Sequence, residues 1–477
     1  MSDLKPPSEP SLDPENWEEL RALGHRMLDD TLEHLAEVRS RPVWRPIPDA
    51  VRARFRADLP EEPGDLAAAY DEYTHSVVPY AAGNVHPGFM GWVQGGGTAV
   101  GMLAEMLAGG LNANLGGRDH MPVEVERQIV QWVRQIFEFP EGASGLFVTG
   151  SSLANFIGVL VARTAALGPS VRKAGLDGAK LRAYASAAAH RCIPLAMDMS
   201  GMGSDAVRPI PVDADGRMEM VKLAEAVARD RAAGLQPFLV VGTAGTVDTG
   251  SIDDLDAIAD FCKAEGLRFH IDGAFGALAV LSPQLKPQVK GIERADSIAF
   301  DFHKWGQVPY DAGFVLVRDG QLHRDTFASP AAYLRTQAKG LAAGAPWFSD
   351  YGPDLSRGFR ALKTWFTLKT FGLKRIGRSI EHSCELARHL EARVRAEPKL
   401  ELLAPARLNI VCFRYRTSDA ANAKIVVDLH ESGIAAPSTT TVNGKLAIRA
   451  AFVNHRTQIR DVDALVDGVL KLGAAAQ

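Results

Sequence analysis

Short apolar segments alternate with amphipathic segments through the middle of the chain. The apolar segments have the length and the β-branched or aromatic content of buried strands, and they cover residues 145–149, 181–186, 237–241, 267–271, 297–300 and 313–317. Helical periodicity fills residues 152–166, 218–233 and 252–265. Strands that alternate with helices are typical of a mostly parallel sheet with helices on both faces, so we predict an α/β domain here.

An amphipathic helix is predicted near the N-terminus, beginning after Asp13-Pro14. Its apolar positions recur at helical spacing on one face and are Trp17, Leu20, Leu23, Leu28, Leu32, Leu35 and Val38. A stripe of this kind must be buried against something. It packs either on its own domain or on a second subunit, and the pattern alone does not choose between them.

The C-terminal part of the chain has a different pattern. A long helical segment begins after Arg360, and strands near 408–415 and 445–452 and a closing helix near 459–472 follow it. We therefore expect three parts. They are an N-terminal helical segment (1–80), a large α/β domain (81–365) and a small α+β domain (366–477).

Residues 81–120 are unusually rich in glycine, with runs such as Gly95-Gly-Gly97. A flexible linker would be more polar, whereas here glycine alternates with apolar residues such as Phe89, Trp92 and Met102. Close approach of the backbone to a ligand or to another backbone explains this composition better.

Composition and charge exclude several classes of protein. The 477 residues are 46% hydrophobic and 23% charged, and the net charge of −4 gives no reason to expect nucleic acid or an anionic membrane as a partner. The four cysteines are scattered and are expected to be buried free thiols. No secretory signal and no run near the roughly 18 apolar residues of a membrane span is visible, so we expect a cytoplasmic protein.

Polar residues gather where the predicted strands end. Thr149-Gly-Ser-Ser152 follows a strand and opens a helix, so its hydroxyls and free N–H groups make a candidate anion site, although a serine cap serves structure alone equally well. Thr243-Ala-Gly-Thr246 ends another strand. The carboxyl ends of parallel strands are where ligands bind in such sheets.

Asp272 and Lys304 end two successive predicted strands. Lys304 lies among aromatic residues, in Asp-Phe-His-Lys-Trp, and a half-buried lysine suits a Schiff base with an aldehyde cofactor. Pyridoxal phosphate (PLP) needs such a lysine and also a carboxylate at its ring nitrogen, which Asp272 provides. Asp272 read on its own is a turn former, and a lone histidine such as His190 is more often structural than catalytic.

Three segments then carry a family resemblance: 295–305 (ADSIAFDFHKW), 269–274 (FHIDGA) and 357–366 (RGFRALKTWF). Together they resemble the group II PLP-dependent decarboxylases, which act on aromatic amino acids, glutamate or histidine. The resemblance runs from about Pro87 to the C-terminus. It implies PLP fold type I, as in aspartate aminotransferase, and a homodimer with active sites at the interface. It therefore favours packing of the N-terminal helix on a partner.

The resemblance also implies residue roles. Lys304 forms the internal aldimine, Asp272 pairs with the ring nitrogen, and His190 stacks on the ring. The other cofactor-binding residues that it implies are Ser151, Ser152 and His303 at the phosphate, Ala274 on the opposite ring face, and Thr246 near the ring substituents. The implied reaction decarboxylates an L-amino acid through an external aldimine and a quinonoid intermediate, giving a primary amine and carbon dioxide. No metal is implied.

The chain departs from the aromatic decarboxylases at the substrate pocket. Those enzymes carry an aromatic pair followed by Pro-Thr where this chain has Trp92-Val-Gln-Gly95, and an Ile and a Phe where it has Asn112 and Asn114. An aromatic amino acid is the first substrate expected. A polar or acidic side chain is the second option, because this pocket is more polar.

The chain also departs at the proton donor. In the family, a loop tyrosine protonates Cα, and an ungapped count back from Phe359 places Phe348 there. Tyr351 is predicted to supply the proton instead, with Tyr333 as the alternative. Family members with phenylalanine at this position tend to give an aldehyde by oxidative decarboxylation–deamination. An aldehyde synthase therefore stays open, as does a carbon–carbon lyase of the same fold.

Asp301 is a third departure, since asparagine is common at this position in the aromatic enzymes. A further acid near a phosphate is unfavourable unless His303 or another cation offsets it. A non-enzymatic scaffold is disfavoured, because a site without a reaction need not keep Lys304, Asp272 and His190 together.

Overall fold

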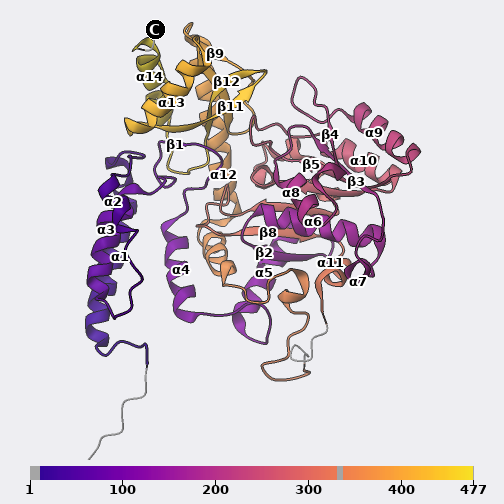
Figure 1. Cartoon of the computed structure of the whole chain (residues 1–477), viewed down its shortest axis with the longest axis horizontal. Helices are drawn as coiled ribbons and strands as arrows, with labels where there is room; N and C mark the ends of the chain where they lie inside the picture. The colour runs from indigo at the N-terminus through magenta and orange to yellow at the C-terminus, as the bar shows by residue number, and fades with distance from the viewer. Residues whose placement is uncertain (1–10, 330–336, 476–477) are drawn as a thin grey trace, which may run out of the picture. The chain divides into compact units, whose positions relative to one another are not determined.

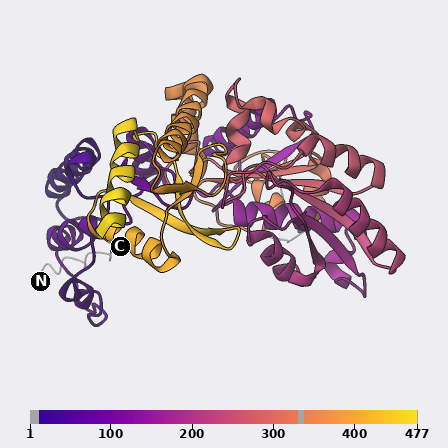
Figure 2. The same ribbon diagram turned by 90° about the horizontal axis from the view of Figure 1, so that it is seen from above.

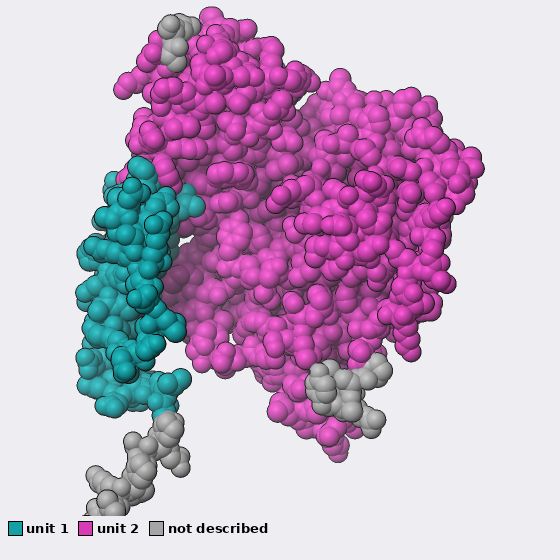
Figure 3. Space-filling view, viewed as in Figure 1, with its two compact units in different colours: residues 1–41, 45–82 teal, residues 42–44, 83–477 magenta. Residues whose placement is uncertain are grey.

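The computed structural model describes residues 11–329 and 337–475. Its internal contacts separate two units, which Figure 3 colours differently. One unit holds residues 1–41 and 45–82, and the other holds residues 42–44 and 83–477.

The first unit is helical. Its helices are α1 (Trp17–Ala36), α2 (Asp49–Arg54) and α3 (Leu66–Ser76). The Asn16 side chain accepts hydrogen bonds from the first N–H groups of α1, and Asp65 does the same for α3. Helix α1 buries none of its residues, and Trp17 is 58% exposed. Of the apolar stripe predicted from sequence, Trp17 is exposed, the five leucines are partly buried and Val38 is buried, so the stripe is only partly covered.

The second unit is built on a seven-stranded sheet of order β2-β8-β7-β6-β5-β3-β4 (Figure 1). Its strands are β2 (Ser144–Val148), β3 (Leu181–Ser186), β4 (Val207–Ile210), β5 (Gln236–Thr243), β6 (Arg268–Asp272), β7 (Ser297–Asp301) and β8 (Gly313–Val317). Strands β3 to β7 pair in parallel, and β8 runs antiparallel to both of its neighbours. Strand β2 therefore ends at the same edge as the parallel strands.

Helices cover both faces of this sheet, as Figure 2 also shows. The described α-helices between residues 99 and 396 are α4 (Ala99–Leu111), α5 (Met121–Ile136), α6 (Ser151–Leu167), α7 (Val171–Ala174), α8 (Cys192–Met199), α9 (Met220–Ala232), α10 (Leu255–Glu265), α11 (Gly320–Phe327) and α12 (Arg360–Ala396), and α4 packs on α12. Successive residues of β7 point to opposite faces: Ile298 and Phe300 join the core cluster of α5, α9 and α10, whereas Ala299 joins that of α6. Burial on both faces explains why these strands are continuously apolar.

A second, mostly antiparallel sheet has the order β1-β11-β12-β10-β9. Its strands are β1 (Phe89–Met90), β9 (Leu400–Leu402), β10 (Ile410–Tyr415), β11 (Ala436–Val442) and β12 (Lys445–Ala451), and α13 (Asp419–Glu431) and α14 (Ile459–Ala475) pack on it. Strand β1 pairs in parallel with β11. The glycine-rich segment thereby brings the small sheet next to the large one.

The predicted α/β class with a mostly parallel sheet is confirmed. The pattern missed β4, a short strand at the sheet edge that contains Pro209 and is only partly buried. Helix α12 crosses the predicted boundary at residue 365. The three-part division at 80 and 365 stays a prediction. None of the helices in the described ranges is long and apolar enough to cross a membrane.

Candidate active site

The carboxyl ends of the parallel strands surround a cavity of about 530 Å³. The predicted site residues that line it are Trp92, Ser151, Ser152, His190, Asp272, Ala274, His303 and Lys304. They follow or end strands β2, β3, β6 and β7, except for Trp92, which comes from the glycine-rich segment. Residues far apart in the sequence thus meet because parallel strands end at one edge.

Lys304 lies in the turn that follows β7. Phe302 and Trp305 are buried on either side of it and hold the turn in place. The Lys304 ammonium lies 2.8 Å from Oδ2 of Asp301, and its side chain is 17% exposed. The lysine therefore opens into the cavity while its charge is compensated by one buried carboxylate.

Asp301 also caps the start of α6. Its Oδ1 accepts a hydrogen bond from the Ser151 N–H at 2.6 Å, and its Oδ2 accepts one from Ser151 Oγ at 2.8 Å. Burial opposes ionisation of Asp301, but the Lys304 charge and the hydrogen bonds from Lys304 and Ser151 outweigh it and hold the pKa of this carboxyl below its usual range. The Lys304 cation thus compensates the negative charge of Asp301, the residue that replaces the asparagine common in the aromatic enzymes.

His303 and His190 are neutral imidazoles. Burial lowers the pKa of His303 to about 4, and its Nδ1 accepts a hydrogen bond from the Ala312 N–H at 3.0 Å. The Tyr310 ring packs on it, with centroids 4.2 Å apart. Burial also lowers the pKa of His190. A neutral, flat ring at position 190 suits stacking on another ring.

Asp272 is the last residue of β6 and is 4% exposed. Its Oδ1 accepts a hydrogen bond from the Ala274 N–H at 3.2 Å. On the neighbouring strand β5, Thr243 stands opposite Asp272 and also lines the cavity, with a buried hydroxyl that has no partner among the described residues. A ligand with a hydrogen-bonding group beside the Asp272 contact would satisfy it.

Thr246, in contrast, is not among the residues that line the cavity. Its Oγ1 accepts a hydrogen bond from the Ser251 N–H at 3.0 Å and lies 3.2 Å from Thr249 Oγ1. The hydroxyl that the strand end offers to the cavity is that of Thr243. Thr243 pairs with Asp272 in the parallel register of β5 and β6, and this pairing is the feature that could have identified Thr243 as a site residue.

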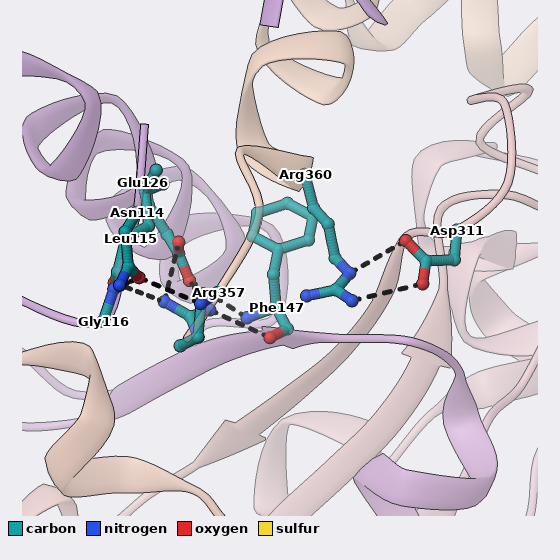
Figure 4. A network of polar contacts seen from close by, with 8 residues as sticks. All are labelled: Asn114, Leu115, Gly116, Glu126, Phe147, Asp311, Arg357 and Arg360. Carbon is teal, nitrogen blue, oxygen red and sulfur yellow. Dashed lines mark hydrogen bonds and ion pairs between the residues drawn. The ribbon is translucent and has the colours of Figure 1, made fainter. Parts of the chain in front are cut away.

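The predicted pocket residues Asn112 and Asn114 do not reach this cavity. Asn112 ends helix α4 in a left-handed conformation, with φ of 46°. Asn114 accepts hydrogen bonds from the N–H groups of Gly116 and Arg357, at 2.9 and 3.0 Å, inside the polar network of Figure 4. Within one chain, these side chains serve the local structure.

Phe348 and Tyr351 also lie away from Lys304. Phe348 is 6% exposed and packs in the apolar cluster that contains Leu146 and Ile157. The Tyr351 ring lies 5.1 Å from the ring of His323, centroid to centroid. Tyr333 falls outside the described residues.

Several residues near the cavity were not singled out as site residues from sequence. Val247, Phe275 and Tyr310 line it, beside Gln94 of the segment 92–95 that the sequence did place at the substrate pocket. Arg449, on β12, donates from Nε to the Val247 carbonyl and from Nη1 to the Trp92 carbonyl, at 2.8 and 3.0 Å, and its buried Nη2 has no partner among the described residues. No local pattern marks Arg449, because only the folded chain places β12 beside these two segments.

The donor set fits pyridoxal phosphate. Asp272 offers a carboxylate for a ring nitrogen, Lys304 an amine for an aldehyde, and Ser152 at the start of α6 a hydroxyl for a phosphate, whereas the N–H and hydroxyl of Ser151 donate to Asp301. The partnerless Thr243 hydroxyl and the small residue Ala274 suit a flat polar ring beside them.

Residues 48–416 match the family model of the pyridoxal-dependent decarboxylase conserved domain, so the chain belongs to this family. It is 32% identical to the aromatic-L-amino-acid decarboxylase of Bacillus atrophaeus, over 96% of each chain. It is 26% identical to the phenylacetaldehyde synthase of Arabidopsis thaliana, over 94% of this chain and 95% of that protein.

A crystal structure of Oryza sativa TDC with PLP and tryptamine has the same fold, with a TM-score of 0.90, 25% identity and coverage of 98% of this chain and 99% of that one. Fold type I and the cofactor PLP are thereby confirmed. The protein is a PLP-dependent amino acid decarboxylase, a carboxy-lyase.

Proposed function

We propose that the chain decarboxylates an L-amino acid to its primary amine and carbon dioxide. The observation that carries this proposal is that Lys304, Asp272 and His190 line one cavity, although they come from three different strand ends. When bound, PLP supplies an electron sink for the electron pair that the departing carbon dioxide leaves behind.

Each residue has a separate task in this proposal. Asp272 holds a proton at the ring nitrogen and fixes the ring in place. The neutral imidazole of His190 packs on one ring face, and Ala274 leaves room at the other. Lys304 holds the cofactor and releases it to the substrate amine. Ser151, Ser152 and His303 bind the phosphate, and Thr243 takes the place expected for Thr246.

The substrate proposed first is an aromatic L-amino acid. Trp92, Phe275 and Tyr310 give the cavity three aromatic side chains, and apolar walls favour an aromatic substrate. Gln94 is the polar group beside them. The relative from Bacillus atrophaeus, which is named for aromatic amino acids, supports the same choice. A substrate with a polar side chain is the alternative that Gln94 favours.

We also propose a homodimer with active sites at the subunit interface. Helix α1 buries none of its residues, and the first unit exposes Trp17 and Phe55, which leaves apolar surface for a partner. Asn112, Asn114 and Tyr351 do not reach the cavity of their own chain and are exposed or only partly buried. In an interface site, residues of this kind can come from the second copy. The cytoplasmic location stays a prediction.

An aldehyde synthase is the second candidate. The observation that favours it is Phe348, which carries no hydroxyl at the position where a tyrosine is expected. Tyr351 packs against His323 and offers no proton to the cavity in this arrangement. Without a proton donor at Cα, molecular oxygen would accept two electrons and water would supply the aldehyde oxygen, so that aldehyde, ammonia and hydrogen peroxide would be released with carbon dioxide in place of the amine.

Product analysis separates the two functions. The PLP-loaded protein is incubated in air with a panel of aromatic, polar and acidic L-amino acids, and amine, aldehyde, carbon dioxide, ammonia and peroxide are measured together. We expect carbon dioxide and amine in equal amounts, fastest with an aromatic substrate. Aldehyde with ammonia and peroxide would establish the synthase. Carbon dioxide from no amino acid in the panel would contradict both.

A further inference from the structure

Four buried polar side chains form a connected line behind Asp272. Cys192 Sγ lies 3.6 Å from Asp272 Oδ2, and Asn155 Nδ2 lies 3.3 Å from Cys192 Sγ. Asn155 Oδ1 lies 2.7 Å from His270 Nε2, and His270 Nδ1 lies 2.7 Å from Ser297 Oγ. None of Asn155, His270 and Ser297 lines the cavity. The proposed decarboxylation gives these residues no task.

The line has one consistent direction. An ionised Asp272 only accepts hydrogen bonds, so the Cys192 thiol gives it its single proton. The sulfur must then accept from the Asn155 amide N–H. The Asn155 carbonyl must in turn accept from His270 Nε2–H, which leaves His270 Nδ1 to accept from the Ser297 hydroxyl.

The protonation states of the two titratable members agree with this direction. Burial lowers the pKa of His270 to about 4, so the ring is neutral and carries one proton. Burial, and then the Asp272 charge, raise the pKa of the Cys192 thiol, which therefore keeps its proton. Every donor in the line then points toward the carboxylate, and hydrogen bonds aligned in this way strengthen one another.

The reverse arrangement has a specific cost. If the Asn155 amide were flipped, its oxygen would face Cys192 and take the thiol proton, and Asp272 Oδ2 would lose this donor. Oδ1 of this buried carboxylate would keep the Ala274 N–H, but Oδ2 would lose the thiol donor, which is unfavourable. The charge of Asp272 therefore selects one orientation of a side chain that it does not touch.

We propose that Cys192, Asn155 and His270 are positioning residues that keep the Asp272 carboxylate aimed at the cofactor ring nitrogen. This inference rests on the proposed function, because it takes Asp272 as the partner of that nitrogen. It adds that the strength of the contact between Asp272 and the ring nitrogen depends on residues that do not touch the cofactor or the substrate.

Cofactor binding to the apoenzyme tests the proposal without any turnover. Cys192→Ala removes the thiol donor, and we expect about five- to tenfold weaker PLP binding, measured by titration of the cofactor's absorption band. Cys192→Ser keeps a donor at this position, and binding within about twofold of the wild type is expected. Cys262→Ala is the matched control: it removes another buried thiol of the large sheet unit, and no change is expected.

A cofactor analogue with carbon in place of the ring nitrogen separates positioning from packing. The analogue offers Asp272 no nitrogen, so wild type and Cys192→Ala should bind it with equal affinity. If Cys192→Ala weakens both cofactors equally, or neither, the proposal is wrong and the line only satisfies buried polar groups. If the wild-type protein does not bind PLP at all, both the proposed function and the positioning role of Cys192, Asn155 and His270 are wrong. The two failures are therefore distinct.

Discussion

Lys304 is the residue on which the proposed chemistry depends most. It lies in a turn held by buried Phe302 and Trp305, and its ammonium pairs with Asp301 at 2.8 Å. Its neighbours are strongly buried, so the backbone position should survive a change of the side chain. Removing the amine also leaves the buried Asp301 without its cation, so the stability of a Lys304 variant is measured beside its activity.

We predict that Lys304→Ala abolishes turnover, with a loss of about a thousandfold or more, since this amine holds the cofactor and releases it to the substrate amine. The visible absorption band of the lysine-bound cofactor should vanish with it. Absorbance spectra and carbon dioxide release measure the two effects. Lys290→Ala, at an exposed lysine on the same sheet unit, is the control that should keep both. A retained band would contradict the assignment of Lys304.

Buried neutral histidines make the fold sensitive to acid. Burial lowers the pKa of His270 to about 4 and that of His323 to about 3, against 6.5 in the unfolded chain. Below about pH 6.5, these two histidines bind protons in the unfolded chain but stay neutral in the folded chain. The free energy of unfolding therefore falls as the pH drops toward the folded pKa values. Each such histidine contributes about 1.4 kcal/mol per pH unit in that window.

We therefore predict a steep loss of unfolding free energy between pH 6.5 and pH 4. His323→Gln should reduce the slope, because one of the proton-binding groups of the unfolded chain is gone. Urea unfolding at several pH values measures it. His25→Gln, at an exposed position of α1, should leave the slope unchanged. A slope that is the same in His323→Gln and wild type would show that His323 does not contribute.

At the scale of elements, one buried ion pair joins α5, β2 and the segment before α12 (Figure 4). Glu126 and Arg357 are 0% and 1% exposed in their side chains and lie 2.5 Å apart. Arg357 also donates to the carbonyls of Leu115 and Phe147, each at 2.9 Å. This network fixes the glycine-rich segment and β2 relative to each other, and β2 leads directly into the α6 end of the cavity.

We predict that Arg357→Met destabilises the protein by about 3–5 kcal/mol, because it leaves Glu126 charged and buried without its partner. Adding Glu126→Leu should recover part of that loss, since no unpaired charge remains. Chemical unfolding of the single and double variants measures this difference. The exposed Lys222–Glu225 pair is the control, where Lys222→Ala should cost no more than about 1 kcal/mol. A double variant less stable than Arg357→Met alone would argue against the unpaired charge as the cause.

At the scale of the whole molecule, the uncovered apolar positions of the first unit bear on assembly. Trp17 and Phe55 are 58% and 59% exposed, which is costly for large aromatic side chains that remain in water. A partner surface is the simplest way to cover them.

We predict that the protein in solution has twice the 51.4 kDa mass of its chain. The double variant Trp17→Glu with Phe55→Glu should shift it toward the monomer and lower activity, because the proposed active sites lie at the interface. Light scattering after size exclusion measures the mass. Val221→Glu, at an exposed position of α9, is the control. A wild-type monomer with full activity would contradict the dimer.

The sequence by itself determined the sheet and the cofactor chemistry. Buried strands are continuously apolar, so their positions can be read from composition, and Asp272, His190 and Lys304 follow strand ends because parallel strands present their carboxyl ends to a ligand. The edge strand β4 was not predicted, because it is only partly buried, contains Pro209 and is therefore not continuously apolar.

Only the tertiary structure decided which side chains face the cavity. Thr243 and not Thr246 lines it, Asn114 turns to Arg357, and Tyr351 turns to His323. These outcomes depend on packing between segments distant in sequence, where one residue of register reverses the face that a side chain occupies. Arg449 and the line from Cys192 to Ser297 have the same origin. Their hydrogen bonds join elements that no local pattern connects.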